Sequence, residues 1–579
     1  EIVWSKIGLN WLKFRISLKN HLKIDMKTFI HAFSDDLSEG IDQSLLGNKG
    51  FNLCVMHRLS LPVPEGFIIT SKATKQLKGL DNFDDKFLNE LQKNLDLLQK
   101  KTNLQIGNPK KPLILSVRSG SMISMPGMLD TILNVGLNQK IVKAIAKKNG
   151  GFFAYDTWRR FIQMYSHVVH RVDNYNFDEI LENYLLGANL SNVNQLDAED
   201  LEEISNMYLR LFNDSVGEEF PEDPFKQINE SITAVLNSWD NERAISYRSI
   251  NDIPNDTGLA VTLQRMVFGN INNNSASGVI FSRNPDTGED KIKGEYLLES
   301  QGEDVVSGFI TPKDINQKGD DAFVNIFPDI YKQINQISDD LERYFGFVQD
   351  IEFTIESNVL WILQSRNAEL NAAASFRVLK DLVHEKIISQ NEALRLINED
   401  HIEKAFAPVL DNSFKFKVLT KGLPASPGVI SGKVVFDYEG IKKVKAKHEK
   451  SILILVETNT NDIKAMHASD GILTSRGGLT SHAAVVARGL NKPCITGALE
   501  IKIHSDERNI SIDDKNISEF DSLTLDGNSG EVIEGIVQTK PQEPSSNLKE
   551  ILSWCDKIIE NENITDPVKI IKKAKKKLQ

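Results

Sequence analysis

A single histidine, His482, stands in the stretch "SRGGLTSHAAVVARG" between a pair of glycines and a run of alanines and valines. The preceding "DGILT" predicts a short strand, the glycines permit a tight turn, and Thr480 or Ser481 is a suitable N-cap for a helix over "HAAVVAR". In the first turn of a helix, unpaired backbone N–H groups and the helix dipole disfavour an imidazolium and stabilise an anion. We therefore expect a neutral, nucleophilic His482 that can carry a phosphoryl group. A histidine that only caps or packs is the simpler alternative, and the spacing leaves it open.

The segment "DIEFTIESNVLWILQSR" predicts a β-hairpin with polar side chains on one face. Asp350 and Glu352 alternate with apolar residues along the first strand, and Gln364 and Arg366 share a face of the second. Carboxylate oxygens suit Mg²⁺, and arginine binds phosphate oxygens in pairs. The hairpin is thus a candidate cradle for Mg²⁺ and polyphosphate. A salt-bridged, exposed sheet face explains the same pattern equally well.

Three further segments could contact phosphate, each through a pattern that many proteins contain. Lys49 in "LLGNKG" and Arg118 in "VRSG" stand beside glycines, which let a backbone approach a ligand. The small residues of "NNNSASG", Asn272 to Gly278, could cover phosphates with their N–H groups or form an ordinary surface loop. The pattern G-x-x-x-x-G-K-[ST] does not occur in the sequence, so a P-loop fold is not indicated.

Several domains must position these residues, because a chain of 579 residues exceeds one hydrophobic core and predicts three or four units. The net charge of -12 argues against nucleic-acid binding, which needs a basic surface. Cys54, Cys494 and Cys555 lie too far apart in sequence for a metal-spaced pair or a disulfide framework, which favours a cytoplasmic location. No apolar run is long enough to span a bilayer, so we expect no membrane insertion.

Helix and strand patterns alternate along the chain in an order that predicts α/β and α+β domains. The pattern is helical from about residue 138 to 236, strands return before the hairpin, and a helical connector then leads to a β-rich unit that contains His482. The later segment "KPQEPSS" is a linker by composition. Residues 1–25 are basic and partly amphipathic, and we interpret them as sequence upstream of a start at Met26 rather than a targeting peptide or a membrane-surface helix.

Taken together, these segments resemble the pyruvate, phosphate dikinase family, to which phosphoenolpyruvate synthase is related. "GGLTSHAAVVARG" resembles the phosphohistidine signature, and "VRSGSMISMPGMLDTILNVGLN", "GEYLLESQGEDVVSG" and "DIEFTIE…LQSR" match further blocks in order. The "SMPGMLDTILNVGLN" block and the "TSH" triplet favour a dikinase over the synthase. The resemblance covers nearly the whole chain after Met26.

The resemblance implies an α/β and α+β multidomain protein, with an ATP-grasp nucleotide-binding domain that carries a helical insertion, followed by a swivelling β/α phosphohistidine domain. By motif position, the ATP contacts would be Lys49, Arg118, Glu352, Gln364 and Arg366. The Mg²⁺ ligands would be Asp350, Glu352 and Gln364. Thr480 matches a regulatory phosphorylation site, where a second phosphate would repel the nucleotide. The expected divisions are 1–25 (extra segment), 26–138 and 237–367 (ATP-grasp), 139–236 (helical insertion), 368–410 (connector), 411–539 (phosphohistidine domain) and 540–579 (linker and approach to a barrel).

The implied reaction has two halves. His482 takes the β-phosphoryl of ATP while inorganic phosphate takes the γ-phosphoryl, which yields AMP and pyrophosphate, and the phosphohistidine then converts pyruvate into phosphoenolpyruvate. The implied partners are ATP, phosphate, pyruvate or phosphoenolpyruvate, and a regulatory kinase. In the family the second half belongs to a C-terminal β/α barrel, and residues 540–579 resemble only the approach to it. We therefore expect this polypeptide alone to load His482 without making phosphoenolpyruvate, unless a separate barrel subunit is supplied.

One residue departs from the family pattern, and two other functions stay open. Met122 stands where many members carry a basic residue, which predicts weaker nucleotide binding by that loop. A stand-alone phosphotransfer enzyme with another acceptor would also need His482. A degenerate protein that binds nucleotide without turnover would not need His482. The presence of His482 together with the acidic hairpin argues against such a protein.

Overall fold

A computed structural model describes residues 29–578, except for residues 39–40, 80–82, 126, 308–310, 320, 399–400, 403–404, 406–408, 412, 459–461, 480, 491, 505–506, 514, 541–543, 560–563 and 565. Residues 1–25, which we interpreted as upstream sequence, lie outside this range. The chain divides into two compact units, Glu1–Val267 and Phe268–Gln579. In the part of the chain that the structure describes, no helix is long and apolar enough to cross a membrane.

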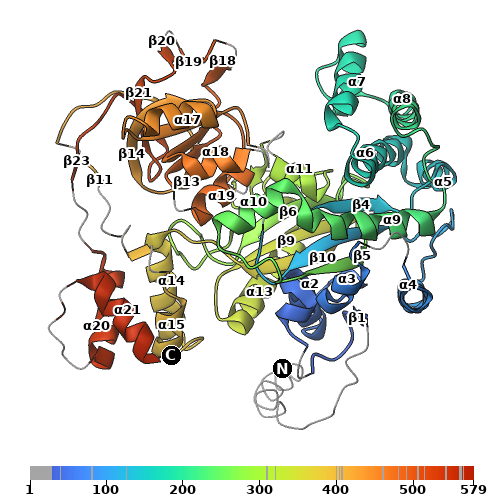
Figure 1. The fold of residues 1–579 in the computed structure, drawn as a ribbon, viewed down its shortest axis with the longest axis horizontal. Helices are drawn as coiled ribbons and strands as arrows, with labels where there is room; N and C mark the ends of the chain where they lie inside the picture. The colour runs from blue at the N-terminus through green and yellow to red at the C-terminus, as the bar shows by residue number, and fades with distance from the viewer. Residues whose placement is uncertain are drawn as a thin grey trace. The chain divides into compact units, whose positions relative to one another are not determined.

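The first unit is built on a five-stranded antiparallel sheet (Figure 1). In spatial order, its strands are β1 (Ile30–Ala32), β2 (Gly66–Ile69), β5 (Leu259–Arg265), β3 (Leu115–Ser121) and β4 (Thr131–Val135). Strand β5 comes last in the sequence of this unit, yet it lies between β2 and β3. Its residues are almost all buried, because helices pack against the sheet and apolar side chains of both faces are covered.

Helices make up the rest of the first unit, and residues 139–237 are helical as the sequence pattern predicted. Helix α6 of this segment packs against β4 and α9 packs against β3, β4 and β5, while α2 packs against β3 and β5 and α3 against β5. The helices are α2 (Gln43–Arg58), α3 (Ser71–Leu77), α4 (Asp85–Thr102), α5 (Gln139–Asn149), α6 (Gly151–His170), α7 (Asn174–Gly187), α8 (Ala198–Val216), α9 (Pro224–Asn237) and α10 (Glu242–Ile250), with short 3-10 helices η1 (Val193–Gln195) and η2 (Ser238–Asp240).

The second unit begins with another five-stranded antiparallel sheet, which contains the predicted hairpin. In spatial order, its strands are β10 (Val359–Asn367), β9 (Gln349–Glu356), β6 (Ala276–Phe281), β7 (Lys293–Leu298) and β8 (Lys313–Asp314). Ser357 and Asn358 both have positive φ angles, which is the two-residue turn that matches the twist of a hairpin. The accompanying helices are α11 (Gly302–Ser307), α12 (Phe323–Ile326) and α13 (Pro328–Phe345).

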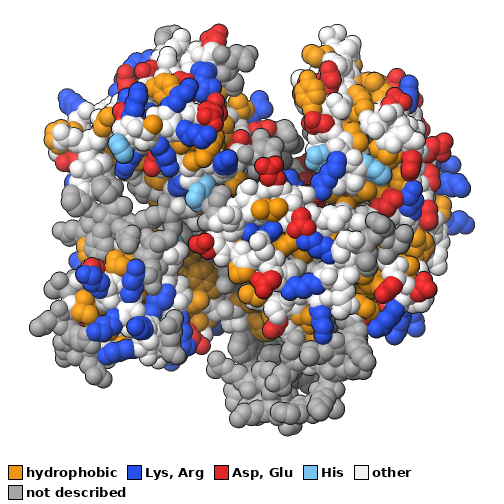
Figure 2. Space-filling view, viewed as in Figure 1, with side chains coloured by type: hydrophobic (Ala, Val, Ile, Leu, Met, Phe, Trp, Pro, Cys, Tyr) orange, Lys and Arg blue, Asp and Glu red, His pale blue; other side chains and the backbone are white. Residues whose placement is uncertain are grey.

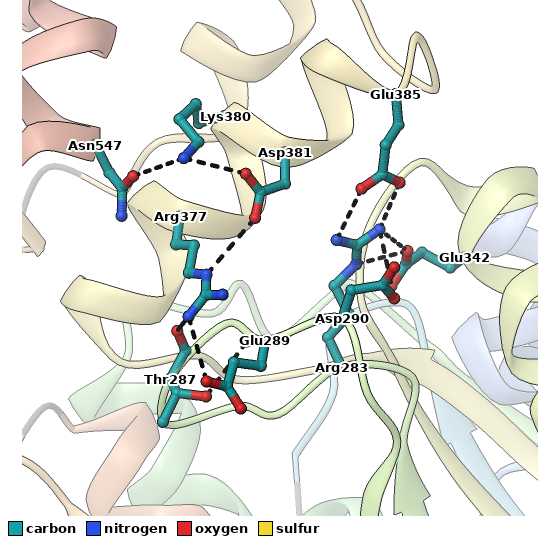
Figure 3. Close-up of polar contacts among 10 residues, drawn as sticks. All are labelled: Arg283, Thr287, Glu289, Asp290, Glu342, Arg377, Lys380, Asp381, Glu385 and Asn547. Atoms are coloured by element: carbon teal, nitrogen blue, oxygen red, sulfur yellow. Dashed lines mark hydrogen bonds and ion pairs between the residues drawn. The ribbon is translucent and has the colours of Figure 1, made fainter.

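A buried arginine fixes the connector to this sheet (Figure 3). The connector contains α14 (Ala372–His384) and α15 (Gln390–Leu396). The Arg283 guanidinium donates to both carboxylate oxygens of Glu385, at 3.1 and 2.7 Å, and its Nε donates to Glu342 at 2.8 Å. Because Glu342 belongs to α13 and Glu385 follows α14, this fully paired cluster joins two helices to the strand end before Arg283.

The other side of α14 packs in a helical bundle with α15, α20 (Ser546–Ile559) and α21 (Pro567–Leu578). Lys380 on α14 donates to Asn547 on α20 at 2.9 Å (Figure 3). The basic end of the sequence forms the polar face of α21, whose apolar residues Ile570, Ile571 and Ala574 are buried. On the face shown in Figure 2, Lys and Arg side chains gather over the region of this bundle.

The β-rich part of the second unit is a mixed eight-stranded sheet with helices on one face. In spatial order, its strands are β12 (Val418–Lys421), β22 (Glu531–Glu534), β21 (Ser522–Asp526), β14 (Val429–Val435), β15 (Ser451–Leu455), β16 (Gly471–Thr474), β17 (Cys494–Thr496) and β13 (Leu423–Ser426). Helices α17 (Tyr438–Lys445), α18 (Ile463–Ala468) and α19 (His482–Gly489) share one core with the sheet. A second hydrophobic core lies between the eight-stranded sheet and a small three-stranded sheet, which consists of β18 (Lys502–His504), β19 (Asn509–Ile512) and β20 (Lys515–Ser518). Outside these, β11 (Val409–Leu410) pairs with β23 (Thr539–Lys540).

Candidate functional site

His482 is the first residue of α19, as the sequence predicted. Strand β16 ends at Thr474, and Gly477 has a φ of 103°, a left-handed conformation that glycine adopts without strain. The N-cap is Ser481, whose backbone is extended. Its hydroxyl makes no capping hydrogen bond and is buried without a partner among the described residues, so the expected side-chain cap is not formed.

The His482 ring is held neutral by burial. Burial lowers its pKa below the ordinary value of 6.5, and Nε2 is a buried atom with no hydrogen-bond partner in the described part of the chain. The sequence analysis expected the same direction but attributed it to the helix N-terminus. The structural cause is desolvation, which disfavours the charged form because imidazolium loses its water. An unpaired ring nitrogen that stays neutral is able to act as a nucleophile near neutral pH.

The turn before His482 is held by hydrogen bonds to its main chain. Leu479 donates its N–H to the Glu295 carboxylate at 2.9 Å, and the Leu479 carbonyl accepts from Arg488 at 2.6 Å. Gly478 leaves room for Glu295, because a Cβ at residue 478 would lie 2.7 Å from both carboxylate oxygens. Sequence reasoning missed Glu295 and Arg488 as site residues, although both lie in family blocks that it had recognised.

The hairpin brings Asp350, Glu352, Gln364 and Arg366 together. In the β9–β10 register, Arg366 is opposite Asp350 and Gln364 is opposite Glu352, so these side chains share a face as predicted. Arg366 donates its Nε to Asp350 at 2.9 Å and forms an ion pair with it at 2.8 Å. The alternative of an exposed, salt-bridged face is wrong in one respect: Asp350 is only 5% exposed, so the ion pair is buried on the acid side.

The Asp350 carboxylate is incompletely paired. Burial raises its pKa, the Arg366 and Arg488 guanidinium groups oppose that rise, and the Glu352 carboxylate adds to it. One of its two oxygens, Oδ1, is buried with no partner among the described residues. An unpaired carboxylate oxygen beside Glu352 suits a divalent cation, which takes oxygen ligands. Among the described residues there is no group of three or more His, Cys, Asp or Glu side chains that could hold a metal ion.

Two more acids lie near these arginines and were not predicted. Burial raises the pKa of Glu369, and the Arg366 and Arg488 guanidinium groups oppose the rise. Burial also raises the pKa of Asp286, against the effect of Arg488. Both residues occur in loops, where side chains follow no period, so periodicity did not single them out.

In the first unit, Lys49 and Arg118 lie beside two glycines whose backbones meet. Gly47 breaks α2 with a φ of 69°, and a Cβ added there would lie 2.5 Å from the Gly120 carbonyl oxygen. Lys49 follows this kink, and its Cβ would be 3.7 Å from a Cβ added at Gly120, two residues after Arg118. Both cations are half-buried, and Met122, in the loop that follows, is 43% exposed.

Two predictions about loops have different outcomes. Thr480 lies outside the described residues, so its regulatory role stays a prediction. The segment Asn272 to Gly278 is not a free loop, because its last three residues begin β6. Asn272 accepts from Asn274 and Ser275 and donates to Ser357 in the hairpin turn at 2.6 Å, which ties the segment to the hairpin.

Comparison of the sequence with known proteins shows which family the chain is similar to. Residues 81–327 match "Pyruvate phosphate dikinase, AMP/ATP-binding domain", and residues 447–530 match "PEP-utilising enzyme, mobile domain", the part that contains His482. The chain is 40% identical over 535 residues to the chloroplastic pyruvate, phosphate dikinase of Flaveria trinervia, covering 92% of this chain. It belongs to the pyruvate, phosphate dikinase family.

Relatives from bacteria and plants match the chain to a similar degree. Pyruvate, phosphate dikinase of Clostridium symbiosum is 41% identical over 520 residues, which cover 89% of this chain and 59% of that protein. Pyruvate, phosphate dikinase 1, chloroplastic, of Arabidopsis thaliana is 39% identical over 534 residues, which cover 91% and 55%. The chain therefore spans little more than half the length of these dikinases. Its multidomain α/β architecture contains the ATP-binding and mobile domains of the family.

Proposed function

We propose that this chain loads a phosphoryl group from ATP onto His482, as the nucleotide half-reaction of a dikinase. Nε2 of His482 attacks the β-phosphorus, the bond from that phosphorus to the α–β bridging oxygen breaks, and AMP leaves. The γ-phosphoryl passes to inorganic phosphate to form pyrophosphate, and the β-phosphoryl stays on the ring nitrogen. The observation that carries the proposal is the buried Nε2 at the start of α19, which has no partner among the described residues and belongs to a ring whose pKa burial lowers.

The proposed roles of the ATP-side residues follow from charge. Phosphoryl transfer asks a protein mainly to position the phosphates and to neutralise their charge. Lys49, Arg118 and Arg366 supply cations, and the polar side chains of Glu352 and Gln364 complete the contacts. Mg²⁺, when bound, would neutralise phosphate oxygens. Asp350, Glu352 and Gln364 would hold it, with the unpaired Asp350 Oδ1 as the first ligand.

We assign residues 26–138 and 237–367 to an ATP-grasp domain, 139–236 to its insertion and 411–539 to a swivelling domain joined by 368–410. The swivelling domain would carry the phosphoryl group to pyruvate in a barrel domain or subunit, giving phosphoenolpyruvate. A kinase that phosphorylates Thr480 would place a second anion beside His482 and slow loading. Three free, buried cysteines, whose pKa values burial raises to about 12, suit a cytoplasmic protein.

Intact-mass measurement after incubation with MgATP and phosphate tests the proposal. The parental chain should gain one phosphoryl group that is lost in acid, and His482→Ala should gain none. His467→Ala is the matched control, because burial also lowers the pKa of His467 and it lies in the same β-rich part of the chain. Equal phosphorylation of the parent and of His482→Ala would contradict the assignment.

A further inference from the structure

Arg488 lies in the last turn of the helix that begins at His482, and it is only 3% exposed. Its guanidinium donates through Nη1 to the carbonyl of Ala425 on β13, at 2.9 Å, and through Nη2 to the carbonyl of Leu479, at 2.6 Å. The side chain therefore reaches from the end of α19 back to the turn before its start. Both bonds are to main-chain acceptors, which do not neutralise its charge.

The Leu479 main chain is thus held from two directions. Its carbonyl accepts a hydrogen bond from Arg488, and its N–H donates to the carboxylate of Glu295 on β7. Leu479 is three residues before His482, so the orientation of the turn sets where the helix and the imidazole begin. A loss of the Arg488 bond would leave the partly buried Leu479 carbonyl without this donor and free the turn to rotate.

The surroundings of Arg488 include acids and an aromatic ring of the hairpin sheet. Among the described residues it makes no ion pair, and burial raises the pKa values of Asp286, Asp350 and Glu369 while the charge of Arg488 opposes that rise. These acids belong to the hairpin sheet and its loops. The Phe281 ring of β6 lies 5.8 Å from the guanidinium carbon and adds a cation–π contact. A buried cation without such acids would be strongly unfavourable.

We propose that Arg488 is a positioning residue for phosphoryl transfer at His482. It fixes the Leu479 turn through its bond to the Leu479 carbonyl, and it anchors the end of α19 to β13 through its bond to the Ala425 carbonyl. The placement of His482 is therefore set from both ends of its helix, and the contact with the Phe281 ring joins this arrangement to the hairpin sheet. This inference rests on the proposed role of His482.

Two readouts test it. In the full chain, Arg488→Met should slow phosphorylation of His482 by about 10- to 100-fold, as expected for loss of a charged hydrogen bond, with the ATP concentration for half-maximal rate unchanged. In Arg488→Ala, added methylguanidinium should restore part of the rate, because it can occupy the vacated volume and bond both carbonyls. A general folding defect would not be rescued in this way.

Hydrogen exchange at Leu479 supplies a readout that does not depend on activity. The Leu479 amide should exchange faster in Arg488→Met, while α17 should be unchanged. Arg508→Met is the matched control, because Arg508 belongs to the same β-rich part but pairs with Asp437 and Glu519; it should leave Leu479 exchange at the parental value. Parental exchange at Leu479 in Arg488→Met, or a slow variant that methylguanidinium does not rescue, would overturn the inference. If the parental chain takes up no phosphoryl group, the proposed function fails, and the exchange result still decides whether Arg488 positions the turn.

Discussion

The Arg283 and Arg366 clusters of the second unit differ in how completely their acids are paired. Arg283 donates to Glu342 and to both oxygens of Glu385, and Ser282 donates to the other oxygen of Glu342 at 2.7 Å. Around Arg366 the Asp350 carboxylate keeps one oxygen that is buried and has no partner within the described ranges of the chain. A saturated network of this kind rigidifies a fold, whereas a buried group without a partner persists only when something else compensates it. The first cluster therefore holds the connector, and the second is suited to a ligand.

Breaking the saturated cluster should have the largest effect, and on stability alone. Arg283→Met leaves Glu342 and Glu385 without their cation, and removing one partner of a buried pair destabilises by about 3–5 kcal/mol. Denaturant unfolding followed by far-ultraviolet circular dichroism measures the loss. The phosphorylation rate per folded molecule should be unchanged. A rate that falls with the stability would place Arg283 in the site and erase the contrast between the clusters.

Removing the arginine of the unsaturated cluster should act on the rate instead. Arg366→Ala should slow phosphorylation of His482 by about 100-fold or more, because a preorganised cation is lost where phosphate charge develops. Rapid quenching with labelled ATP measures the rate, and the folding midpoint in denaturant measures stability. Arg377→Ala, an arginine of the same unit that is 38% exposed, is the control and should keep the parental rate. Parental kinetics in Arg366→Ala would mean that the nucleotide site lies elsewhere.

A smaller change tests the unpaired oxygen itself. Asp350→Asn keeps the shape of the side chain but removes the charge, and we expect the Mg²⁺ concentration for half-maximal phosphorylation to rise by about 10-fold. Titration of Mg²⁺ at saturating ATP measures the shift. Thr354→Val is the matched control, because Thr354 is buried on the same face of β9 and should leave the titration unchanged. An unaltered Mg²⁺ titration in Asp350→Asn would remove this acid from the metal site.

The smallest effect concerns pH. His482 has a folded pKa below its unfolded value near 6.5, so the unfolded chain binds more protons in the window between the two values. His482 should therefore make the free energy of unfolding rise with pH through that window and stay constant above about 6.5. The difference between the parent and His482→Gln isolates this term from the other buried histidines. The phosphorylation rate should fall below the same window as the ring becomes protonated, and a rate that rises on acidification would contradict a neutral nucleophile.

Local sequence determined much of this protein. The glycine turn and the alanine- and valine-rich run predicted a helix that starts at His482, and α19 does start there. The alternation in "DIEFTIE" and the "ESN" turn predicted the hairpin, because side chains on a strand alternate and a short turn joins antiparallel strands. The shared face of Asp350 and Arg366 also needs a β-bulge between Ile362 and Gln364, which shifts the register so that Arg366 lies opposite Asp350. The family resemblance, carried by blocks in order, was confirmed by the comparisons.

Only the tertiary structure decided how these residues are paired and buried. The pKa of His482 is lowered by desolvation, which depends on residues far away in sequence, so the helix-dipole argument reached the right direction without this cause. Sequence spacing could not reveal that Glu295 accepts from Leu479, 184 positions away, or that Arg488 reaches back over the turn. It also could not distinguish the saturated Arg283 cluster from the unsaturated one at Asp350. Periodicity records which face a side chain is on, whereas burial and partner number are set by what the rest of the chain brings to that face.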